Sequence, residues 1–446
     1  MKKTDVLVIG GSAGGLLSAT TTKKVYKDKS VTLVRKTNTV MVPCGIPYIF
    51  GTLHDTAKNR IPDTMITDLG VELMINEVQK IDAEQKTATL QDGEQIQFDK
   101  LILATGSNPI VPTFIEGHDL ENVFPIIKSE AYLADLLKKL KSVQNVAVIG
   151  GGFIGVEFAE QLQKNGKHVT LIEIADQILW QAFDQAICQM TADDLVAHGI
   201  TLKTGTKVSK MLGSKQVECV ELTDGEIIPA DAVILGMGVT PNSSLAVEAG
   251  LQTDEKGAIL VDEYMRTSKK DIFAVGDCAK KRCFFTNKDI SILLASTAAM
   301  EAKIAASNLY GLRFIRENKG TISAFSTKIY EKTYASAGIT ERRALDEGFD
   351  IVLGKFATMD KHPGTLPGAN KIDLTLIFTK TSGILMGAQI SGGDTVGELI
   401  NILSLAIQQG LTANELNTFQ TATHPLITSS PIAYPINAAS LDALTK

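Results

Sequence analysis

One sequence unit occurs twice in this chain, and that repeat limits the folds open to it. Residues 6–35 contain VLVIGGSAGG and then SVTLVR, while residues 146–173 read VAVIGGGFIGVEFAEQLQKNGKHVTLIE. Each copy predicts a buried strand, a glycine-rich turn, a helix with apolar spacing and a second strand. Such a βαβ unit holds a dinucleotide pyrophosphate at a helix N-terminus. The sequence therefore predicts an α/β fold with two Rossmann-like dinucleotide-binding domains.

The second copy carries the full glycine pattern. Gly150, Gly152 and Gly155 supply the tight turn, the close backbone approach and the helix–strand contact. Glu173 ends the second strand, where a carboxylate binds a ribose 2′-hydroxyl and repels a 2′-phosphate. The pattern favours NADH over NADPH, and the alternative is a glycine-rich turn without a ligand.

The first copy departs from the pattern at two positions. Gly10 and Gly15 are in place, but Ser12 occupies the middle glycine position and Arg35 ends the second strand. Ser12 still offers hydroxyl and amide donors to a phosphate. Arg35 has no acceptor for a ribose hydroxyl, so its place fits stacking on an adenine or contact with a phosphate.

Two later segments strengthen the dinucleotide interpretation of the first copy. LILATGSNP (101–109) is an apolar strand that leads into a turn of small residues, and DIFAVGDCA (271–279) is another. The second of these ends in Gly276 and Asp277. A carboxylate at the end of a buried strand is placed to accept a hydrogen bond from a polyol chain.

Length, charge and cysteine content narrow the class of protein further. A chain of 446 residues exceeds one compact core, so we expect two or three domains. A net charge of −6 gives no electrostatic reason to expect nucleic acid or an anionic membrane as a partner. The apolar run at 6–10 is too short for a signal peptide and no window approaches a membrane span, which predicts a soluble cytoplasmic protein. Five scattered cysteines do not form a disulfide framework.

Taken in order, the motifs of this chain resemble those of the FAD- and NAD(P)H-dependent pyridine nucleotide–disulfide oxidoreductases. The matching segments are GGSAGG (10–15), CGIPY (44–48), ATG (104–106), GGGFIG (150–155), GVTPN (238–242) and VGDCA (275–279). The resemblance implies four segments: an FAD-binding domain (1–112), an NAD(P)H-binding domain (113–243), a return to the FAD-binding domain (244–318) and an α+β dimerisation domain (319–446).

The last segment is compatible with that implied domain. Residues 327–340 and 372–392 are typical of strands, with a turn at Thr381–Gly383. Residues 396–410 predict a helix with one broad apolar face that ends at Gly410. The resemblance implies that two such segments form a homodimer.

Cys44 resembles the redox thiol of the single-cysteine branch of the family, which contains coenzyme A-disulfide reductases, NADH oxidases and NADH peroxidases. PCGIPY is most similar to the coenzyme A-disulfide and persulfide reductases. We expect a thiol at a helix N-terminus beside flavin to have a lowered pKa. A lone cysteine suits a mixed disulfide, a persulfide or a sulfenic acid, and the alternative is a small buried hydrophobe. For the others, Cys188, Cys219, Cys278 and Cys283, we expect ordinary packing rather than chemistry, and we expect no metal site.

The substrate is less closely defined. Ala13 and Gly14 stand where the oxidases and peroxidases carry a histidine, which argues against a peroxidase and weakens an oxidase. Thr21 stands where the coenzyme A-disulfide reductases have an arginine, although Lys23 and Lys24 follow it. Leu366 and Ala422 stand where that group has tyrosines, which weakens coenzyme A disulfide itself as the substrate.

His424 is the second candidate catalytic residue. His424-Pro425 resembles the His-Pro pair that the partner subunit supplies in dithiol reductases, although Ser429 replaces the expected glutamate. We expect His424 of a second subunit to protonate a leaving thiolate near Cys44, the alternative being a surface histidine. Tyr434 is a weaker candidate for the missing phenol.

These residues predict a homodimeric flavoprotein that oxidises NADH, with NADPH left open, and reduces a small disulfide, persulfide or polysulfide through Cys44. The alternatives are an NADH oxidase that reduces oxygen to water or peroxide, and a ferredoxin- or rubredoxin-type reductase or redox sensor. Phe153 is expected to cover the flavin and Glu157 to contact the nicotinamide half, with packing as the competing explanation for both. The resemblance implies cofactor contacts at Gly10, Ser12, Ala13, Gly14, Gly15, Arg35, Pro43, Val78, Ala104, Thr105, Gly106, Gly150, Gly152, Phe153, Ile154, Gly155, Glu157, Glu173, Gly238, Gly276, Asp277 and Ala295.

Overall fold

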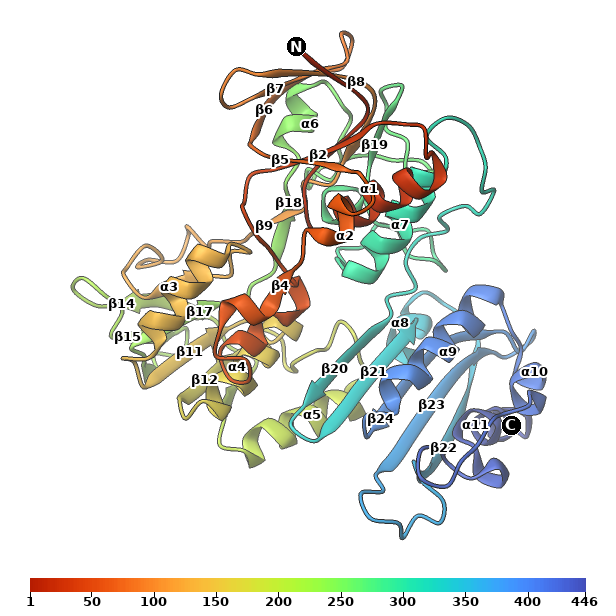
Figure 1. The fold of residues 1–446 in the computed structure, drawn as a ribbon. Helices are drawn as coiled ribbons and strands as arrows, with labels where there is room; N and C mark the ends of the chain where they lie inside the picture. The colour runs from red at the N-terminus through yellow and green to blue at the C-terminus, as the bar shows by residue number, and fades with distance from the viewer.

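The computed structural model describes residues 1–446, and its elements gather around three main sheets (Figure 1). Two of these sheets are built on parallel strands and carry the two glycine-rich repeats. The third is antiparallel and lies in the C-terminal part of the chain, drawn in blue in Figure 1. The predicted α/β fold with two Rossmann-like units and an α+β C-terminal part is confirmed.

The first sheet has seven strands. It combines strands from the beginning and from the end of the N-terminal two thirds of the chain. Its order is β5-β2-β1-β8-β7-β6, and β19 pairs with β8 on the other side of that strand. The strands β5, β2, β1, β8 and β19 run parallel, whereas β6 and β7 form an antiparallel extension. Their bounds are β1 Lys2–Ile9, β2 Val31–Arg35, β5 Glu72–Ile75, β6 Val78–Asp82, β7 Thr87–Leu90, β8 Gln95–Leu103 and β19 Ile272–Ala274.

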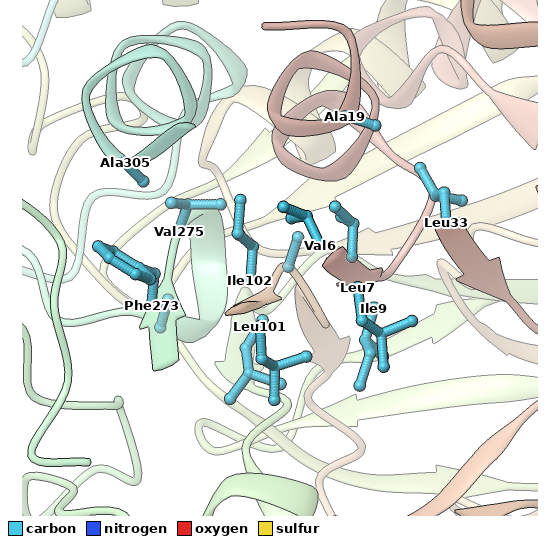
Figure 2. Close-up of a cluster of buried hydrophobic side chains, with 14 of the residues drawn as sticks. Val6, Leu7, Ile9, Ala19, Leu33, Leu101, Ile102, Phe273, Val275 and Ala305 are labelled. Atoms are coloured by element: carbon cyan, nitrogen blue, oxygen red, sulfur yellow. The ribbon is translucent and has the colours of Figure 1, made fainter. Parts of the chain in front are cut away.

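A hydrophobic layer fixes two helices on this sheet. The helices α1 (Ala13–Val25) and α7 (Ala295–Ser307) lie side by side, and Figure 2 shows Ala19 and Ala305 pointing from them toward the strands. Val6, Leu7 and Leu101 are completely buried, and consecutive strand residues such as Val6 and Leu7 point to opposite faces of the sheet. Buried β-branched and leucine side chains on both faces are typical of parallel strands covered on both sides. Small residues on the two helices allow this close approach.

The second sheet has five parallel strands in the order β10-β17-β11-β12-β13. The predicted strand–helix–strand repeat is confirmed here as β11, α4 and β12, as it is in the first sheet as β1, α1 and β2. A three-stranded antiparallel sheet, β14-β15-β16, packs beside it. The bounds are β10 Val123–Pro125, β11 Asn145–Ile149, β12 His168–Ile172, β13 Thr201–Lys203, β14 Val208–Leu212, β15 Cys219–Leu222, β16 Ile227–Pro229, β17 Ala232–Leu235, α3 Glu130–Leu140, α4 Phe153–Lys164 and α5 Gln185–Ala197.

The chain leaves the first sheet and returns to it through one two-stranded ribbon. Strand β9 (Ser107–Pro109) pairs antiparallel with β18 (Val239–Pro241). The outgoing and returning chains therefore lie next to each other between the two parallel sheets. The ribbon lies within a few residues of the boundaries expected at 112/113 and 243/244, which stay predictions.

The third sheet is antiparallel, in the order β20-β21-β24-β23-β22, and packs against α9 and α11. The predicted helix ends as expected, because Gly410 adopts a left-handed φ of 67° after α9. The turn expected at Thr381–Gly383 joins β23 to β24, and the strand character expected for residues 327–340 is found in the hairpin of β20 and β21. The bounds are β20 Phe325–Ile329, β21 Lys332–Gly338, β22 Ile351–Met359, β23 Lys371–Thr379, β24 Leu385–Gly392, α8 Glu341–Asp346, α9 Val396–Gln409, α10 Ala413–Thr418 and α11 Pro435–Leu444.

Short elements complete the fold. The segment after Cys44, which the sequence allowed as the start of a helix, forms two consecutive 3₁₀ turns instead, because Pro43 and Pro47 each open a separate short turn. None of the helices combines the length and apolar character that crossing a bilayer requires. The remaining bounds are β3 Val40–Met41, β4 Arg60–Ile61, α2 Thr64–Thr67, α6 Ser244–Glu248 and the 3₁₀ turns Pro43–Gly45, Pro47–Ile49, Thr56–Asn59, Gly276–Cys278 and Pro431–Ala433.

Two adjacent glycines of α1 give a matched test of this packing. A Cβ on Gly15 would lie 1.9 Å from the carbonyl oxygen of Gly10, whereas one on Gly14 would meet only ordinary contacts at 3.4 Å and beyond. We expect Gly15→Ala to lower the melting temperature by at least about 5 °C through overpacking. Gly14→Ala should leave it within about 2 °C, since alanine favours the helix. Thermal unfolding followed by circular dichroism measures both, and equal effects of the two variants would contradict the packing described.

Candidate functional site

The first glycine loop forms a backbone cradle at the end of β1. Gly10 has a φ of +112°, and a Cβ there would lie 2.1 Å from the carbonyl oxygen of Ala104. The Ser12 hydroxyl makes no capping bond, so it stays available at the N-terminus of α1. Ala13, Gly14 and Gly15 begin the helix directly above the loop. Free amides and a helix N-terminus in this arrangement fit a pyrophosphate.

Arg35 is engaged in an ion pair that the sequence did not suggest. Its guanidinium donates to both carboxylate oxygens of Asp63 at 2.6 and 2.8 Å and to the carbonyls of Thr37 and Asn38. The residue is 4% exposed, and its side chain packs directly under Gly11. Arg35 therefore supports the glycine loop from below through its stem. A direct contact with the adenosine half stays a prediction.

Asp277 lies where strands β8 and β19 end. Its Oδ2 accepts hydrogen bonds from Ser107 Oγ at 2.7 Å and from Lys128 Nζ at 3.4 Å, and no hydrogen bond reaches Oδ1. Thr105 and Gly106 precede Ser107 in the neighbouring turn. One carboxylate oxygen therefore remains for a ligand hydroxyl, which fits the expected polyol contact. Sequence reasoning missed Lys128, because no motif marks it.

The second glycine loop repeats the first with a carboxylate added. Gly150 has a φ of +109°, and a Cβ on Gly155 would lie 1.8 Å from the Gly150 carbonyl oxygen. Gly152 faces open space. Glu173 accepts hydrogen bonds from the amides of Gly151 and of Ala175, the second at 2.8 Å. The carboxylate at the end of β12 is thus fixed against the loop, where a nucleotide ribose would meet it.

Cys44 is exposed in the 3₁₀ turn Pro43–Gly45, and no second cysteine lies in that segment. Partial burial and the carboxylate of Glu157 raise the pKa of the thiol, and Lys128 acts in the opposite direction. The expectation of a helix N-terminus that lowers this pKa is wrong, because a turn of three residues has no helix dipole to offer. Burial first, and neighbouring charges second, set the ionisation of the thiol in the protein alone.

Glu157 and Phe153, on α4, both make contacts with the hairpin β20–β21. Thr327 Oγ1 donates to Glu157 Oε1 at 2.9 Å, and burial raises the pKa of Glu157 to about 7. The Phe153 ring stacks on Phe325 with 5.0 Å between ring centroids. Sequence reasoning missed Thr327 and Phe325, which no family motif marks. The expected contacts of Glu157 with nicotinamide and of Phe153 with flavin stay predictions.

His424 lies on an exposed loop of the C-terminal part. Its amide donates to Thr428 Oγ1 at 2.9 Å, and its ring nitrogen Nδ1 accepts from the amide of Leu426 at 3.3 Å. The loop also exposes Ile427 and, a few residues on, Ile432 at 95%. Tyr434 is 8% exposed and packs edge-on against Phe419. The ring belongs to the core of this part of the chain, and its role as the missing phenol stays a prediction.

The other expected contacts occupy defined places in the fold. Val78 is buried at the start of β6, and Ala295 is the first residue of α7. Gly238 has a φ of +90° just before β18, and Ile154 is exposed in the first turn of α4. Cys188, Cys278 and Cys283 are buried and Cys219 is half-buried, in agreement with ordinary packing. Lys23 donates to the carbonyls of Lys27 and Lys29, so its charge is committed to closing the loop after α1.

The geometry defines a class of protein with two dinucleotide sites and one exposed thiol between them. The family described as pyridine nucleotide-disulphide oxidoreductase matches residues 4–302, and its dimerisation domain matches residues 325–432. An NADH oxidase of Methanocaldococcus jannaschii is 31% identical over 99% of this chain and 98% of that protein. An NAD(P)H coenzyme A polysulfide/persulfide reductase of Pyrococcus horikoshii is 32% identical over 93% of each. The solved structure of an NAD-dependent persulfide reductase from A. fulgidus has a TM-score of 0.90 and 31% identity, covering 99% of this chain and 83% of that one.

This chain belongs to the pyridine nucleotide-disulphide oxidoreductase family. It is an FAD-dependent NAD(P)H oxidoreductase, and its C-terminal part is the family's dimerisation domain. The two glycine loops and the free oxygen of Asp277 fit these two cofactors. The expected family is confirmed.

The charges around Cys44 can be tested by its reactivity. Glu157→Gln should lower the apparent pKa of Cys44, because it removes a nearby negative charge. Lys128→Met should raise that pKa, because it removes a nearby positive charge. The pH dependence of iodoacetamide labelling at Cys44, followed by peptide mass spectrometry, measures both. Glu255→Gln, an exposed and remote carboxylate, is the control, and equal behaviour of Glu157→Gln and this control would contradict the arrangement.

Proposed function

We propose that this chain oxidises NADH and reduces a small persulfide, polysulfide or disulfide through FAD and Cys44. The observation that carries the proposal is the single exposed thiol in the 3₁₀ turn, since three of the other four cysteines are buried and none lies in that segment. A lone thiol needs its second sulfur from the substrate. The names of the relatives from Pyrococcus horikoshii and A. fulgidus support the same sulfur chemistry.

Cys44 performs the sulfur transfer in this proposal. Its thiolate attacks the outer sulfur of a persulfide R–S–SH, the substrate S–S bond breaks and R–S⁻ leaves, so that Cys44 becomes Cys–S–SH. FAD held at the first glycine loop and Asp277 would supply the two electrons, taken from NADH as a hydride. Reduction of Cys–S–SH by two electrons would release HS⁻ and restore the Cys44 thiolate.

The surrounding side chains control protons and charge. Lys128 favours the Cys44 thiolate, while Glu157 opposes it and, with a pKa of about 7, changes charge in the working pH range. The departing R–S⁻ needs a proton if its ordinary pKa is near that of a free thiol. We place His424 of a second subunit there, since imidazole donates protons near neutrality.

Glu173 supports NADH as the coenzyme. Its carboxylate is 8% exposed and is held against the second glycine loop by two backbone amides. A 2′-phosphate at that place would bring two more negative charges next to a buried carboxylate. A ribose hydroxyl would instead find an acceptor.

A homodimer in the cytoplasm is the form we propose for the working enzyme. The dimerisation domain exposes large apolar side chains that a second copy would cover, among them Leu405, Leu426, Ile427 and Ile432. Exposed large apolar side chains in a dimerisation domain fit a subunit interface. The same domain carries His424, which explains how one subunit would complete the site of the other.

A second candidate function is the reduction of oxygen, with Cys44 passing through a sulfenic acid. The similarity to the NADH oxidase of Methanocaldococcus jannaschii over nearly the whole chain favours it. Both functions use the same thiol and the same cofactors. The two functions differ in which electron acceptor is reduced.

Acceptor assays on wild type and Cys44→Ser decide between the two. We expect anaerobic NADH oxidation with coenzyme A persulfide or polysulfide, and a loss of at least about 100-fold in Cys44→Ser because serine forms no persulfide. Cys219→Ser is the control, since Cys219 is half-buried and distant from any motif. Turnover only in air assigns the protein to the oxidases. Equal turnover by wild type and Cys44→Ser would overturn both proposals.

Complementation between two inactive variants tests His424. We expect Cys44→Ser and His424→Gln each to lose activity, the second by about 10² from the missing general acid. A heterodimer of the two variants contains one intact site if His424 serves the partner's Cys44. It should therefore regain about half of the wild-type activity per dimer. No regain, measured on dimers purified through two different tags, would show that His424 does not act across the interface.

A further inference from the structure

A buried ion pair lies beneath the turn that carries Asp277, and the mechanism above does not use it. Lys281 and Glu301 approach within 3.0 Å, and their side chains are 3% and 1% exposed. Lys281 follows the 3₁₀ turn Gly276–Cys278, while Glu301 lies in the middle of α7. No sequence motif singled out either residue.

The two side chains of the pair form hydrogen bonds with both the amide and the carbonyl of Gly276. Glu301 Oε2 accepts the amide of Gly276 at 2.8 Å, and Lys281 Nζ donates to the carbonyl of Gly276 at 2.6 Å. Lys281 also donates to the carbonyl of Ala279 at 2.8 Å and to Glu301 itself. Every donor of the Lys281 ammonium group is therefore used. The two side chains and the backbones of Gly276 and Ala279 form one hydrogen-bond network.

Gly276 has a conformation that suits glycine and disfavours a residue with a side chain. Its φ is +74°, and a Cβ there would crowd Ala298 of α7 at 3.3 Å. The next residue is Asp277, whose Oδ1 is left without a protein partner. The direction of that carboxylate depends on the peptide plane between Gly276 and Asp277. The ion pair fixes this plane.

Stability alone does not explain two charges at this place. Taking a lysine and a glutamate out of water is costly, and a buried pair replaced by apolar residues is often neutral or more stable. A buried pair is best explained by a geometry that it specifies. Here the geometry joins the Asp277 turn to α7, whose first residue is Ala295.

We propose that Lys281 and Glu301 are a positioning pair for FAD. This ion pair holds the Asp277 turn and α7 in the arrangement that the flavin side of the cofactor requires. The inference rests on the proposed cofactor contact of Asp277. The pair does not touch the ligand. It acts through the backbone of Gly276 and so sets where the free oxygen of Asp277 points.

The test compares FAD binding with thermal stability in four variants of the full-length holoprotein. Glu301→Gln keeps an acceptor for Gly276 but leaves Lys281 unpaired, and Lys281→Met removes both carbonyl donors. The double variant Lys281→Met/Glu301→Gln contains no buried charge and keeps the experiment informative if a single variant fails to fold. Lys100→Met, which breaks the partly buried Lys100–Asp271 pair in the same sheet, is the matched control.

We expect the dissociation constant of FAD, measured by fluorescence quenching, to rise at least tenfold in the double variant. The flavin absorption bands and the midpoint potential of the bound flavin should also change in it. Lys100→Met should lower the melting temperature while FAD affinity stays within twofold. A double variant with wild-type FAD affinity, absorption and potential would overturn the positioning role, whatever its melting temperature.

Asp277→Asn separates failure of this inference from failure of its premise. If Asp277→Asn also leaves FAD affinity unchanged, the cofactor contact of Asp277 is wrong and the inference falls with it. If Asp277→Asn weakens FAD binding while the double variant does not, only the positioning pair is wrong. None of these readouts depends on the electron acceptor, so they do not repeat the test of Cys44.

Discussion

Both nucleotide-binding units depend on one contact, in which a glycine backbone lies directly against a carbonyl beyond the neighbouring parallel strand. Gly10 follows β1 and faces the carbonyl of Ala104 beyond β8, while Gly150 follows β11 and faces the carbonyl of Gly236 beyond β17. A Cβ at either glycine would overlap that oxygen, at 2.1 and 2.4 Å. Parallel pairing brings the carboxyl ends of these strands to one edge of each sheet. The loops, the helix N-termini and the polar turns therefore meet where a dinucleotide binds.

The same edge explains why distant segments form one site. The turn after β19 reaches the first loop because β19 pairs with β8. Ser107 and Asp277, which form a hydrogen bond there, are 170 residues apart along the chain. The ribbon β9–β18 allows the second unit to be inserted without disturbing that pairing. Asp277 then comes within reach of both Ser107 and Lys128, which lie before and within the inserted segment. Long-range sheet pairing, rather than any local motif, brings together the residues proposed to hold the first cofactor.

Sequence reasoning succeeded where backbone geometry demands a residue type. The glycines of both loops, Gly410 at the end of α9 and the buried strands follow from local rules, and the structure has them as expected. It failed where side chains meet across the fold. Asp63 beneath Arg35, Lys128 beside Asp277 and Glu301 beneath Gly276 belong to no motif. Pro43 and Pro47 divide the segment around Cys44 into two short turns, so the thiol lies in a 3₁₀ turn and not at a helix N-terminus.

That last difference changes how the thiol must be activated. A helix N-terminus would favour the thiolate by itself, whereas a three-residue turn contributes almost nothing. Partial burial and Glu157 oppose ionisation of Cys44, and Lys128 is the one cation that favours it. Without cofactor or partner, these groups keep Cys44 closer to a thiol than to a thiolate. In the proposed enzyme, the flavin and His424 of a second subunit would be the further groups that shift this balance.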